Sequence, residues 1–155
     1  AHEKGMKIVL NPSPMNAKIL SYPLEYVDYF LLNEVEASDI CGIEATKDPQ
    51  ALMNGLVKQF PEAKIVLTLG GDGSVVLDST SATPIQRIAP VRVNAVDTTG
   101  CGDSFMGTVL AGLASGMALS EAAELASYVS AYAATGYGAQ ASYGNAAQIR
   151  EAFAK

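Results

Sequence analysis

The feature that most constrains the fold is a set of short apolar runs in which apolar and polar residues do not alternate. The runs are Ile8-Val9-Leu10, Tyr29-Phe30-Leu31-Leu32 and Ile65-Val66-Leu67. Such runs are typical of strands in a parallel sheet, because both faces of the sheet are then buried. Helical segments are predicted between them, over residues 34–41 and 48–60. This alternation predicts an α/β fold with a mostly parallel sheet flanked by helices.

A glycine-rich tetrapeptide predicts that part of the sheet is antiparallel. Gly70-Gly71-Asp72-Gly73 is followed directly by a further apolar run, Ser74-Val75-Val76-Leu77-Asp78. Two apolar runs joined by so short a glycine cluster indicate a hairpin. Residues 79–96 are rich in Ser, Thr and Pro and predict a short edge strand with loops.

Three further helices are predicted in the second half of the chain. The first begins near Asp103, where apolar residues recur at helical spacing, and ends at Gly116. Ser120 is the expected N-cap of the second helix, and the third begins at about Asn145. A chain of 155 residues can bury one substantial core, so we expect residues 1–155 to form a single domain.

Composition excludes several classes of function. The 16 acidic residues outnumber the 10 basic ones for a formal net charge of −6, so we expect no nucleic-acid partner. No apolar run reaches the roughly 20 residues that cross a bilayer, so we expect no membrane partner and a cytoplasmic location. His2 is the only histidine, and the two cysteines, Cys41 and Cys101, are expected to be reduced and buried. Any chemistry must therefore use carboxylates, amides, hydroxyls and the backbone.

The strongest chemical signal is the segment AVDTTGCGDSF at residues 95–105. Gly100 and Gly102 flank Cys101 where a helix is predicted to begin, so backbone N–H groups are left free there and the helix dipole adds positive charge. This arrangement predicts an anion-binding site. The carboxylate of Asp103 lies beside it and could accept a proton from an attacking hydroxyl. The alternative is that the glycines only shape a turn and Asp103 only stabilises a helix start.

This segment resembles the signature of the ribokinase family, also called the PfkB carbohydrate kinases, whose pattern is close to D-T-x-G-A-G-D-x-F. Cys101 replaces the middle alanine, and a small side chain is acceptable where the backbone amide is what binds. The resemblance implies a ribokinase-like three-layer fold and ATP-dependent phosphorylation of a sugar hydroxyl. It implies that Asp103 is the base and that the amides of Gly100, Cys101 and Gly102 form the anion hole.

Two more segments resemble motifs of this family in the same order. Leu32-Asn33-Glu34-Val35-Glu36-Ala37 matches N-x-x-E, which implies that Asn33 and Glu36 bind the nucleotide and that Glu36 holds Mg²⁺ through water. The structural alternative, which can hold at the same time, is an N-cap with a glutamate in the first helical turn. Thr68-Leu69-Gly70-Gly71-Asp72-Gly73 matches T-L-G-x-x-G, which implies contact of Thr68, Gly70 and Gly73 with ATP.

The segment Gly138-Ala139-Gln140-Ala141-Ser142 resembles the G-A-Q-P-S stretch that borders the adenine pocket and a monovalent cation site in this family. Ala141 replaces the proline. The resemblance implies a K⁺ site formed by Ser142 with Asp97 and Thr99.

The predicted binding residues share a position relative to the predicted strands. Asn11, Asn33, Gly70 and the turn of residues 97–103 each follow a strand. Ligands of open α/β sheets bind at the carboxyl ends of strands, so we expect these loops to converge on one crevice.

The resemblance covers essentially the whole chain but only the C-terminal portion of the family. Complete members carry N-terminal strands, a lid and a glycine-rich sugar-binding signature that this sequence lacks. We expect the chain to be part of a longer protein, and its exposed sheet edge and apolar surface to favour a homo-oligomer. A truncated, catalytically incompetent nucleotide-binding fragment is an alternative. A Rossmann dehydrogenase is a weaker one, since no G-x-G-x-x-G follows the first strand.

One further segment bears on the identity of the substrate. Asn11-Pro12-Ser13-Pro14 resembles the N-P-x-P of ribokinases, which favours ribose as the sugar substrate. Fructose and nucleosides stay open as alternatives.

Overall fold

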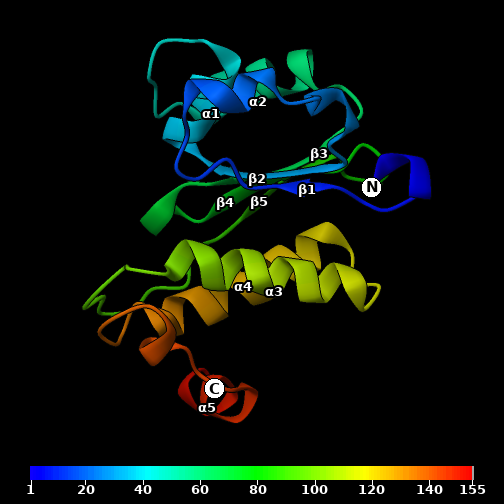
Figure 1. Ribbon diagram of the computed structural model, residues 1–155. Coiled ribbons are helices and arrows are strands. Elements are labelled where there is room, and N and C mark those ends of the chain that lie inside the picture. Colours follow the sequence, from blue (N-terminus) through cyan, green and yellow to red (C-terminus); the bar gives the residue numbers. More distant parts are fainter. Residues whose placement is uncertain (155) are drawn as a thin grey trace. The chain divides into compact units, whose positions relative to one another are not determined.

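The computed structural model describes residues 1–154, and the chain divides into two compact units. Unit 1 is Ala1–Arg87 and unit 2 begins at Ile88. Unit 1 contains nearly all of a β-sheet with two helices, and unit 2 is helical (Figure 1). The predicted α/β class is confirmed.

The sheet has five strands in the order β1-β2-β3-β4-β5. The strands are β1 (Val9–Leu10), β2 (Tyr29–Asn33), β3 (Lys64–Thr68), β4 (Ser74–Leu77) and β5 (Ile85–Ile88). Strands β1, β2 and β3 pair in parallel, and β3 pairs with β4 antiparallel. The predicted parallel strands, the glycine hairpin and the short edge strand are therefore all confirmed.

Helices α1 (Glu34–Cys41) and α2 (Pro49–Gln59) connect the parallel strands β2 and β3, and both lie on one face of the sheet (Figure 1). A parallel connection requires such a crossover. The core between helices and sheet includes Phe30, whose ring centroid lies 4.4 Å from that of Phe60. The side chains of β2 and β3 that face it are fully buried, each contributing roughly 1.5–3 kcal/mol to folding; they are Phe30, Leu32, Ile65 and Leu67. Short 3₁₀ segments cover His2–Lys4, Ala17–Ser21, Leu24–Tyr26 and Gly70–Asp72.

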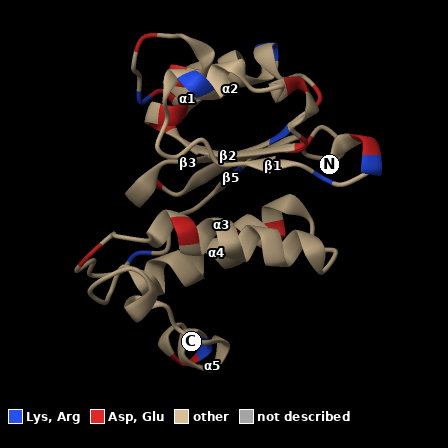
Figure 2. Ribbon diagram, viewed as in Figure 1, with Lys and Arg blue, Asp and Glu red and all other residues tan. Residues whose placement is uncertain are grey.

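Unit 2 is built on two helices that pack against each other, α3 (Cys101–Ala114) and α4 (Leu119–Ala133). Gly112 allows the close approach, because a Cβ at that position would lie 2.8 Å from the Cβ of Ala122. Figure 2 shows how few charges these helices carry: Asp103 is the only charged residue of α3. No helix within residues 1–154 is both long and apolar enough to span a bilayer.

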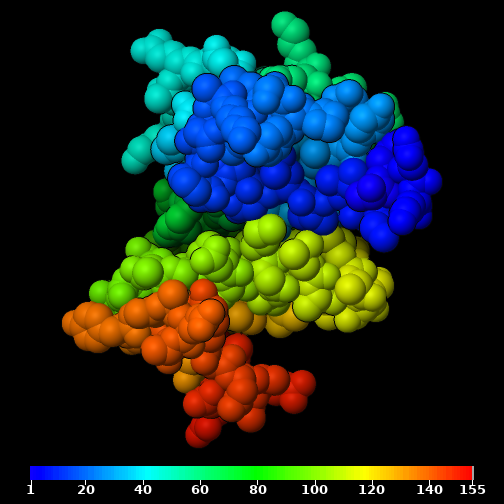
Figure 3. Space-filling view, viewed as in Figure 1, coloured from blue at the N-terminus to red at the C-terminus, as the bar shows by residue number. Residues whose placement is uncertain are grey.

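The last helix, α5 (Ala146–Ala152), follows a 3₁₀ segment at Gln140–Ser142. It begins next to Asn145, where its start was predicted; Asn145 is the N-cap, and its Oδ1 accepts hydrogen bonds from the N–H groups of Ala147 and Gln148. Helix α5 contains no buried residue, and the end of the chain protrudes from unit 2 in Figure 3. Its anchor is an edge-to-face contact of Phe153 with Tyr128, 5.3 Å between ring centroids.

Two local predictions are wrong. Helix α4 begins at Leu119, so Ser120 lies inside the helix and does not cap it. The physical reason is Glu121, whose carboxylate accepts a hydrogen bond from the N–H of Ala118 at 3.0 Å and moves the helix start upstream. Cys41 and Cys101 are half-buried where full burial was expected.

Candidate active site

Residues 97–103, here called the 97–103 turn, lead into helix α3. Gly100 is the N-cap of α3 and has φ 77° and ψ −1°, a left-handed conformation that glycine adopts without steric cost. A Cβ at Gly100 would lie 2.6 Å from Tyr143 Oη and 2.7 Å from the Cβ of Ala139. Backbone conformation and packing therefore both require glycine here.

No side chain caps helix α3. Among the described residues, the N–H groups of Gly100, Gly102 and Asp103 have no acceptor, and the N–H of Cys101 donates to the Thr98 carbonyl at 3.2 Å. This last bond is longer than the usual 2.9–3.0 Å or so, so a bound anion could compete for it. Open N–H groups and the helix dipole together favour an anion at this point.

The carboxylate beside these amides is accessible. Asp103 and Gly102 are exposed, and a Cβ added to Gly102 would meet no atom within 4 Å. The 97–103 turn therefore has room for a ligand next to a carboxylate that could accept a proton.

Contacts from α4 and the segment after it hold the 97–103 turn in place. The Ala134 carbonyl accepts the N–H of Asp97 at 3.2 Å, and Asp97 Oδ2 accepts the N–H of Gly138 at 2.9 Å. Ser130 Oγ donates to the Cys101 carbonyl at 3.1 Å, and Tyr143 Oη donates to the Gly100 carbonyl at 2.9 Å. The Gly138 bond, followed by bonds from Thr99, lowers the pKa of Asp97. Asp97 is therefore a carboxylate at neutral pH.

The residues predicted to bind K⁺ already have partners within the protein. Asp97 accepts one N–H on each carboxylate oxygen, from Thr99 at 2.9 Å and from Gly138. Ser142 is buried and its Oγ donates to the Ala139 carbonyl at 2.8 Å. The bonds donated by Gly138 and Ser142 account for the conformation of this segment without a bound ion. The K⁺ site stays a prediction.

In unit 1, Asn33 and Glu36 form a capping box at the start of α1. Asn33 Oδ1 accepts from the N–H of Glu36, and Glu36 Oε2 accepts from the N–H of Asn33, both at 2.9 Å. The structural alternative for this motif is confirmed. Within residues 1–154 the only fully buried side-chain oxygen or nitrogen without a partner is Ser74 Oγ. Glu36 as a whole is only 5% exposed, and its Oε1, which has no partner there either, is not among the fully buried atoms.

The remaining predicted nucleotide-binding residues of unit 1 lie together at the carboxyl ends of β2 and β3. Thr68 is the register partner of Asn33, and its Oγ1 donates to the Leu32 carbonyl at 3.3 Å. The turn of residues 70–73 follows directly, with positive φ at Gly70 (54°) and Gly73 (88°). Asn33, Thr68, Gly70 and Gly73 are thus neighbours, whereas convergence of the loops of both units on one crevice stays a prediction.

The described residues fit a magnesium ion held mainly by water and substrate phosphates better than a metal site made wholly of protein ligands. Within residues 1–154 no group of three or more His, Cys, Asp or Glu could hold a metal. Mg²⁺ usually keeps several waters and is bound by one or two carboxylates together with substrate phosphates. The free Oε1 of Glu36 fits that mode.

Comparison with known proteins identifies the family. The model of the pfkB family carbohydrate kinases matches residues 1–145. The chain belongs to this family. As a pfkB member it is 31% identical to the ribokinase of Mus musculus over 147 residues, which are 92% of this chain and 45% of that protein.

Solved structures confirm the fold of this pfkB chain. The ribokinase of Giardia lamblia superposes with a TM-score of 0.80 at 27% identity, covering 96% of this chain and 50% of that one. The ribokinase of Cryptococcus neoformans var. grubii in complex with ADP has a TM-score of 0.82 at 23% identity, covering 97% and 52%. The fold is therefore ribokinase-like, and the chain spans about half the length of these relatives.

Several residues that shape the site were missed from the sequence. Ser130 and Tyr143 bond to the 97–103 turn from 29 and 43 residues away. In unit 1, Arg87 donates to the Asp72 carbonyl at 3.2 Å and supports the turn of residues 70–73. Contacts between positions so far apart leave no local pattern by which a single sequence could reveal them.

Proposed function

We propose that this chain is the nucleotide-binding and catalytic portion of an ATP-dependent sugar kinase. The observation that carries the proposal is the uncapped start of α3, where open backbone N–H groups lie next to the exposed carboxylate of Asp103. Membership of the pfkB family supports the same assignment.

In this proposal Asp103 accepts the proton of the attacking sugar hydroxyl. The N–H groups of Gly100 and Gly102, joined by that of Cys101, hold the terminal phosphoryl group as negative charge develops on its oxygens. Phosphoryl transfer depends mainly on positioning and electrostatic stabilisation, which fixed backbone amides supply.

For unit 1 we propose nucleotide binding by Asn33, Thr68, Gly70 and Gly73. Glu36 keeps its capping role through Oε2 and holds Mg²⁺ through water with Oε1. When bound, Mg²⁺ neutralises phosphate charge. The ADP in the Cryptococcus neoformans ribokinase supports a nucleotide as the ligand of this fold.

The proposed acceptor is ribose. The Asn11-Pro12-Ser13-Pro14 segment and the similarity to the ribokinase of Mus musculus support it. Fructose and nucleosides are the competing acceptors.

A second candidate is a nucleotide-binding fragment without transfer activity. The observation that favours it is the length of the chain, which spans about half of its relatives. The two candidates make the same prediction for ATP binding and opposite predictions for turnover.

An ADP-release assay coupled to NADH oxidation separates them. It is run on the 155-residue chain and on the full-length product of its gene, with ribose, fructose or a nucleoside as acceptor. Ribose-dependent ADP release supports the kinase. ATP binding by calorimetry with no release for any acceptor, in either protein, supports the inert module and contradicts the kinase.

A further inference from the structure

Tyr143 lies outside every motif described above, yet it contacts the centre of the 97–103 turn. Its hydroxyl donates to the Gly100 carbonyl at 2.9 Å. The same carbonyl accepts the first N–H of helix α3, from Ser104, also at 2.9 Å. Two donors from different parts of unit 2 thus fix the direction of the Gly100 carbonyl.

The orientation of this carbonyl determines that of an amide in the proposed anion hole. The peptide group between Gly100 and Cys101 is planar, and its C=O and N–H point in opposite directions. A donor that fixes the Gly100 carbonyl therefore also fixes the Cys101 N–H. On the N–H side the only partner among residues 1–154 is the Thr98 carbonyl, at 3.2 Å.

The start of helix α3 needs a support from elsewhere in unit 2, because the residues at the helix start do not fix the Gly100 carbonyl by a side-chain cap. Helix α3 has no side-chain cap, and Gly100 is the residue type with the greatest backbone freedom. Ala139 and Tyr143 pack directly against Gly100, where a Cβ would lie 2.7 Å and 2.6 Å from them. The segment that carries both residues therefore restricts Gly100 by packing as well as by the hydrogen bond.

The hydroxyl of Tyr143 stays a donor under the conditions of the reaction. Burial, followed by the charge of the Asp103 carboxylate, raises the pKa of Tyr143 above its usual value.

We propose that Tyr143 is a positioning residue for phosphoryl transfer, one that fixes the orientation of the Gly100–Cys101 peptide group, whose N–H would exchange the Thr98 carbonyl for the transferred phosphoryl. The inference rests on the proposed function of the 97–103 turn. Tyr143 acts through the backbone and is not assigned a contact with substrate.

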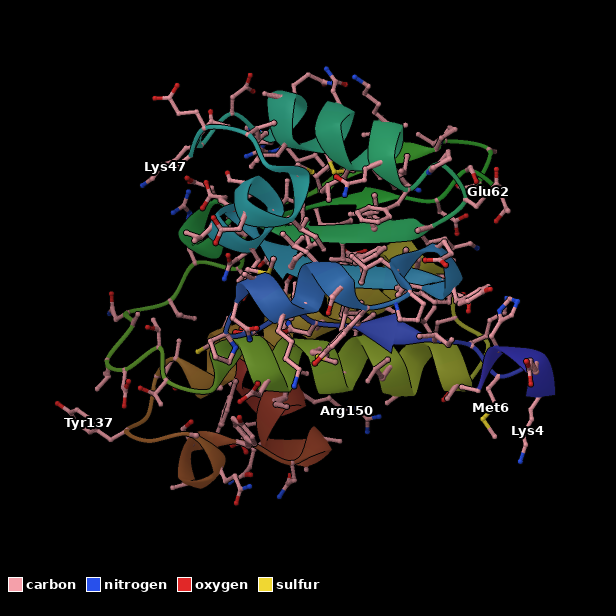
Figure 4. All side chains as sticks on the ribbon, turned by 45° about the horizontal axis from the view of Figure 1, so that its top comes forward. Lys4, Met6, Lys47, Glu62, Tyr137 and Arg150 are labelled. Carbon is pink, nitrogen blue, oxygen red and sulfur yellow. The ribbon has the colours of Figure 1, made fainter. Side chains whose placement is uncertain are left out.

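The test is Tyr143→Phe, which removes the hydroxyl and keeps the ring, in the protein used for the ADP-release assay. The matched control is Tyr137→Phe. Tyr137 is 79% exposed, its hydroxyl has no hydrogen bond within residues 1–154, and its side chain projects outward in Figure 4. Loss of one orienting hydrogen bond should lower kcat about five- to tenfold, with KM for ATP and sugar within about twofold of wild type. The control should match wild type.

The two cysteines supply a second measurement that does not depend on turnover. Cys101 is the first residue of α3, and Cys41 in unit 1 is an internal reference. Release of the Gly100 carbonyl should speed alkylation of Cys101 by iodoacetamide severalfold in Tyr143→Phe, with Cys41 unchanged. Tyr137→Phe should leave both rates unchanged.

Three results overturn the inference. They are an unchanged kcat in Tyr143→Phe, an unchanged rate of Cys101 alkylation, and a fall in kcat matched by a fall in the unfolding temperature and a rise in KM, which marks a purely structural role. The proposed function fails differently: wild type then shows no transfer to any acceptor. An active wild type with an equally active Tyr143→Phe leaves the kinase standing and removes only the role of Tyr143.

Discussion

Helix α1 begins with a reciprocal cap in which side chains accept two N–H groups, those of Asn33 and Glu36, whereas no side chain caps the start of helix α3. At α1, Asn33 and Glu36 bond reciprocally within four residues. At α3, the N-cap is Gly100, which has no side chain, and its support comes from Tyr143 and Ser130 on later segments. A cap of the first kind contributes roughly 1 kcal/mol to stability, which α3 lacks.

The difference shows how a helix start can be kept available for a ligand. A side-chain cap occupies the N–H groups that would bind an anion, so a binding helix start has to be held through its carbonyls. The contacts at Gly100 and Cys101 do this, because Tyr143 and Ser130 both donate to carbonyl oxygens. The variants below test whether α3 is the functional helix start and α1 the structural one.

The largest effect is expected from Asp103→Asn. The amide cannot accept the proton of the sugar hydroxyl, so kcat should fall by about 10²- to 10⁴-fold while ATP still binds with nearly unchanged affinity. The coupled assay and calorimetry measure the two quantities. Glu121→Gln in the first turn of α4 is the matched control, since it makes the same change of group in the same unit and keeps an acceptor for the Ala118 N–H. Full turnover by Asp103→Asn would refute its role as base.

The next effect separates two glycines of the 97–103 turn. In Gly100→Ala the alanine has to adopt the left-handed conformation of Gly100, and its Cβ clashes with Tyr143 and Ala139. The free energy of unfolding should therefore fall by about 2 kcal/mol or more. Gly102→Ala places a methyl group in open space and should leave stability unchanged or slightly raised. The same methyl group lies at the open amides, so the affinity for ATP should fall. Denaturant unfolding measures the stability of each variant, and calorimetry measures its affinity for ATP. Equal stabilities of the two variants would contradict the geometry of Gly100.

Most of the fold could be predicted because its signals are local. The apolar runs determine β2 and β3, and the glycine cluster indicates the hairpin, since each depends only on neighbouring residues. Asn33 and Glu36 show where local reasoning stops: four residues suffice to predict the cap, but not whether Glu36 also holds a metal. Tyr143 could not be predicted, because its hydroxyl acts on a carbonyl 43 residues earlier. The prediction of Ser120 as the N-cap of α4 was wrong. Both Ser120 and Glu121 can accept N–H groups at a helix start, and the bond from the Ala118 N–H to Glu121 determined where the helix begins.

A smaller effect is expected at α1, where Glu36→Ala and Glu36→Gln divide the two roles of the side chain. Alanine removes the acceptor for the Asn33 N–H and should cost about 1 kcal/mol of unfolding free energy. Glutamine keeps an acceptor and should be nearly as stable as wild type, yet it should require more Mg²⁺ for half-maximal turnover. Unfolding curves and a magnesium titration measure these changes. If Glu36→Gln is indistinguishable from wild type in both, the start of α1 is purely structural and the metal role fails.

The smallest effect concerns how the 97–103 turn responds to acid. Asp97 accepts N–H groups of Thr99 and Gly138, and its pKa is lowered, first by the Gly138 bond. A carboxyl group with a lower pKa in the folded state stabilises the fold above its unfolded pKa of about 3.9, and this contribution is lost as pH falls through the folded pKa.

The unfolding temperature of Asp97→Asn should therefore lie a few degrees below that of wild type at pH 7, and the difference should narrow below about pH 4. Asp39→Asn is the control: Asp39 is an exposed aspartate of α1 whose side chain has no hydrogen bond within residues 1–154, and at pH 7 this variant should unfold at nearly the temperature of wild type. A gap for Asp97→Asn that stays constant down to pH 3 would mean that the carboxylate charge does not hold the turn.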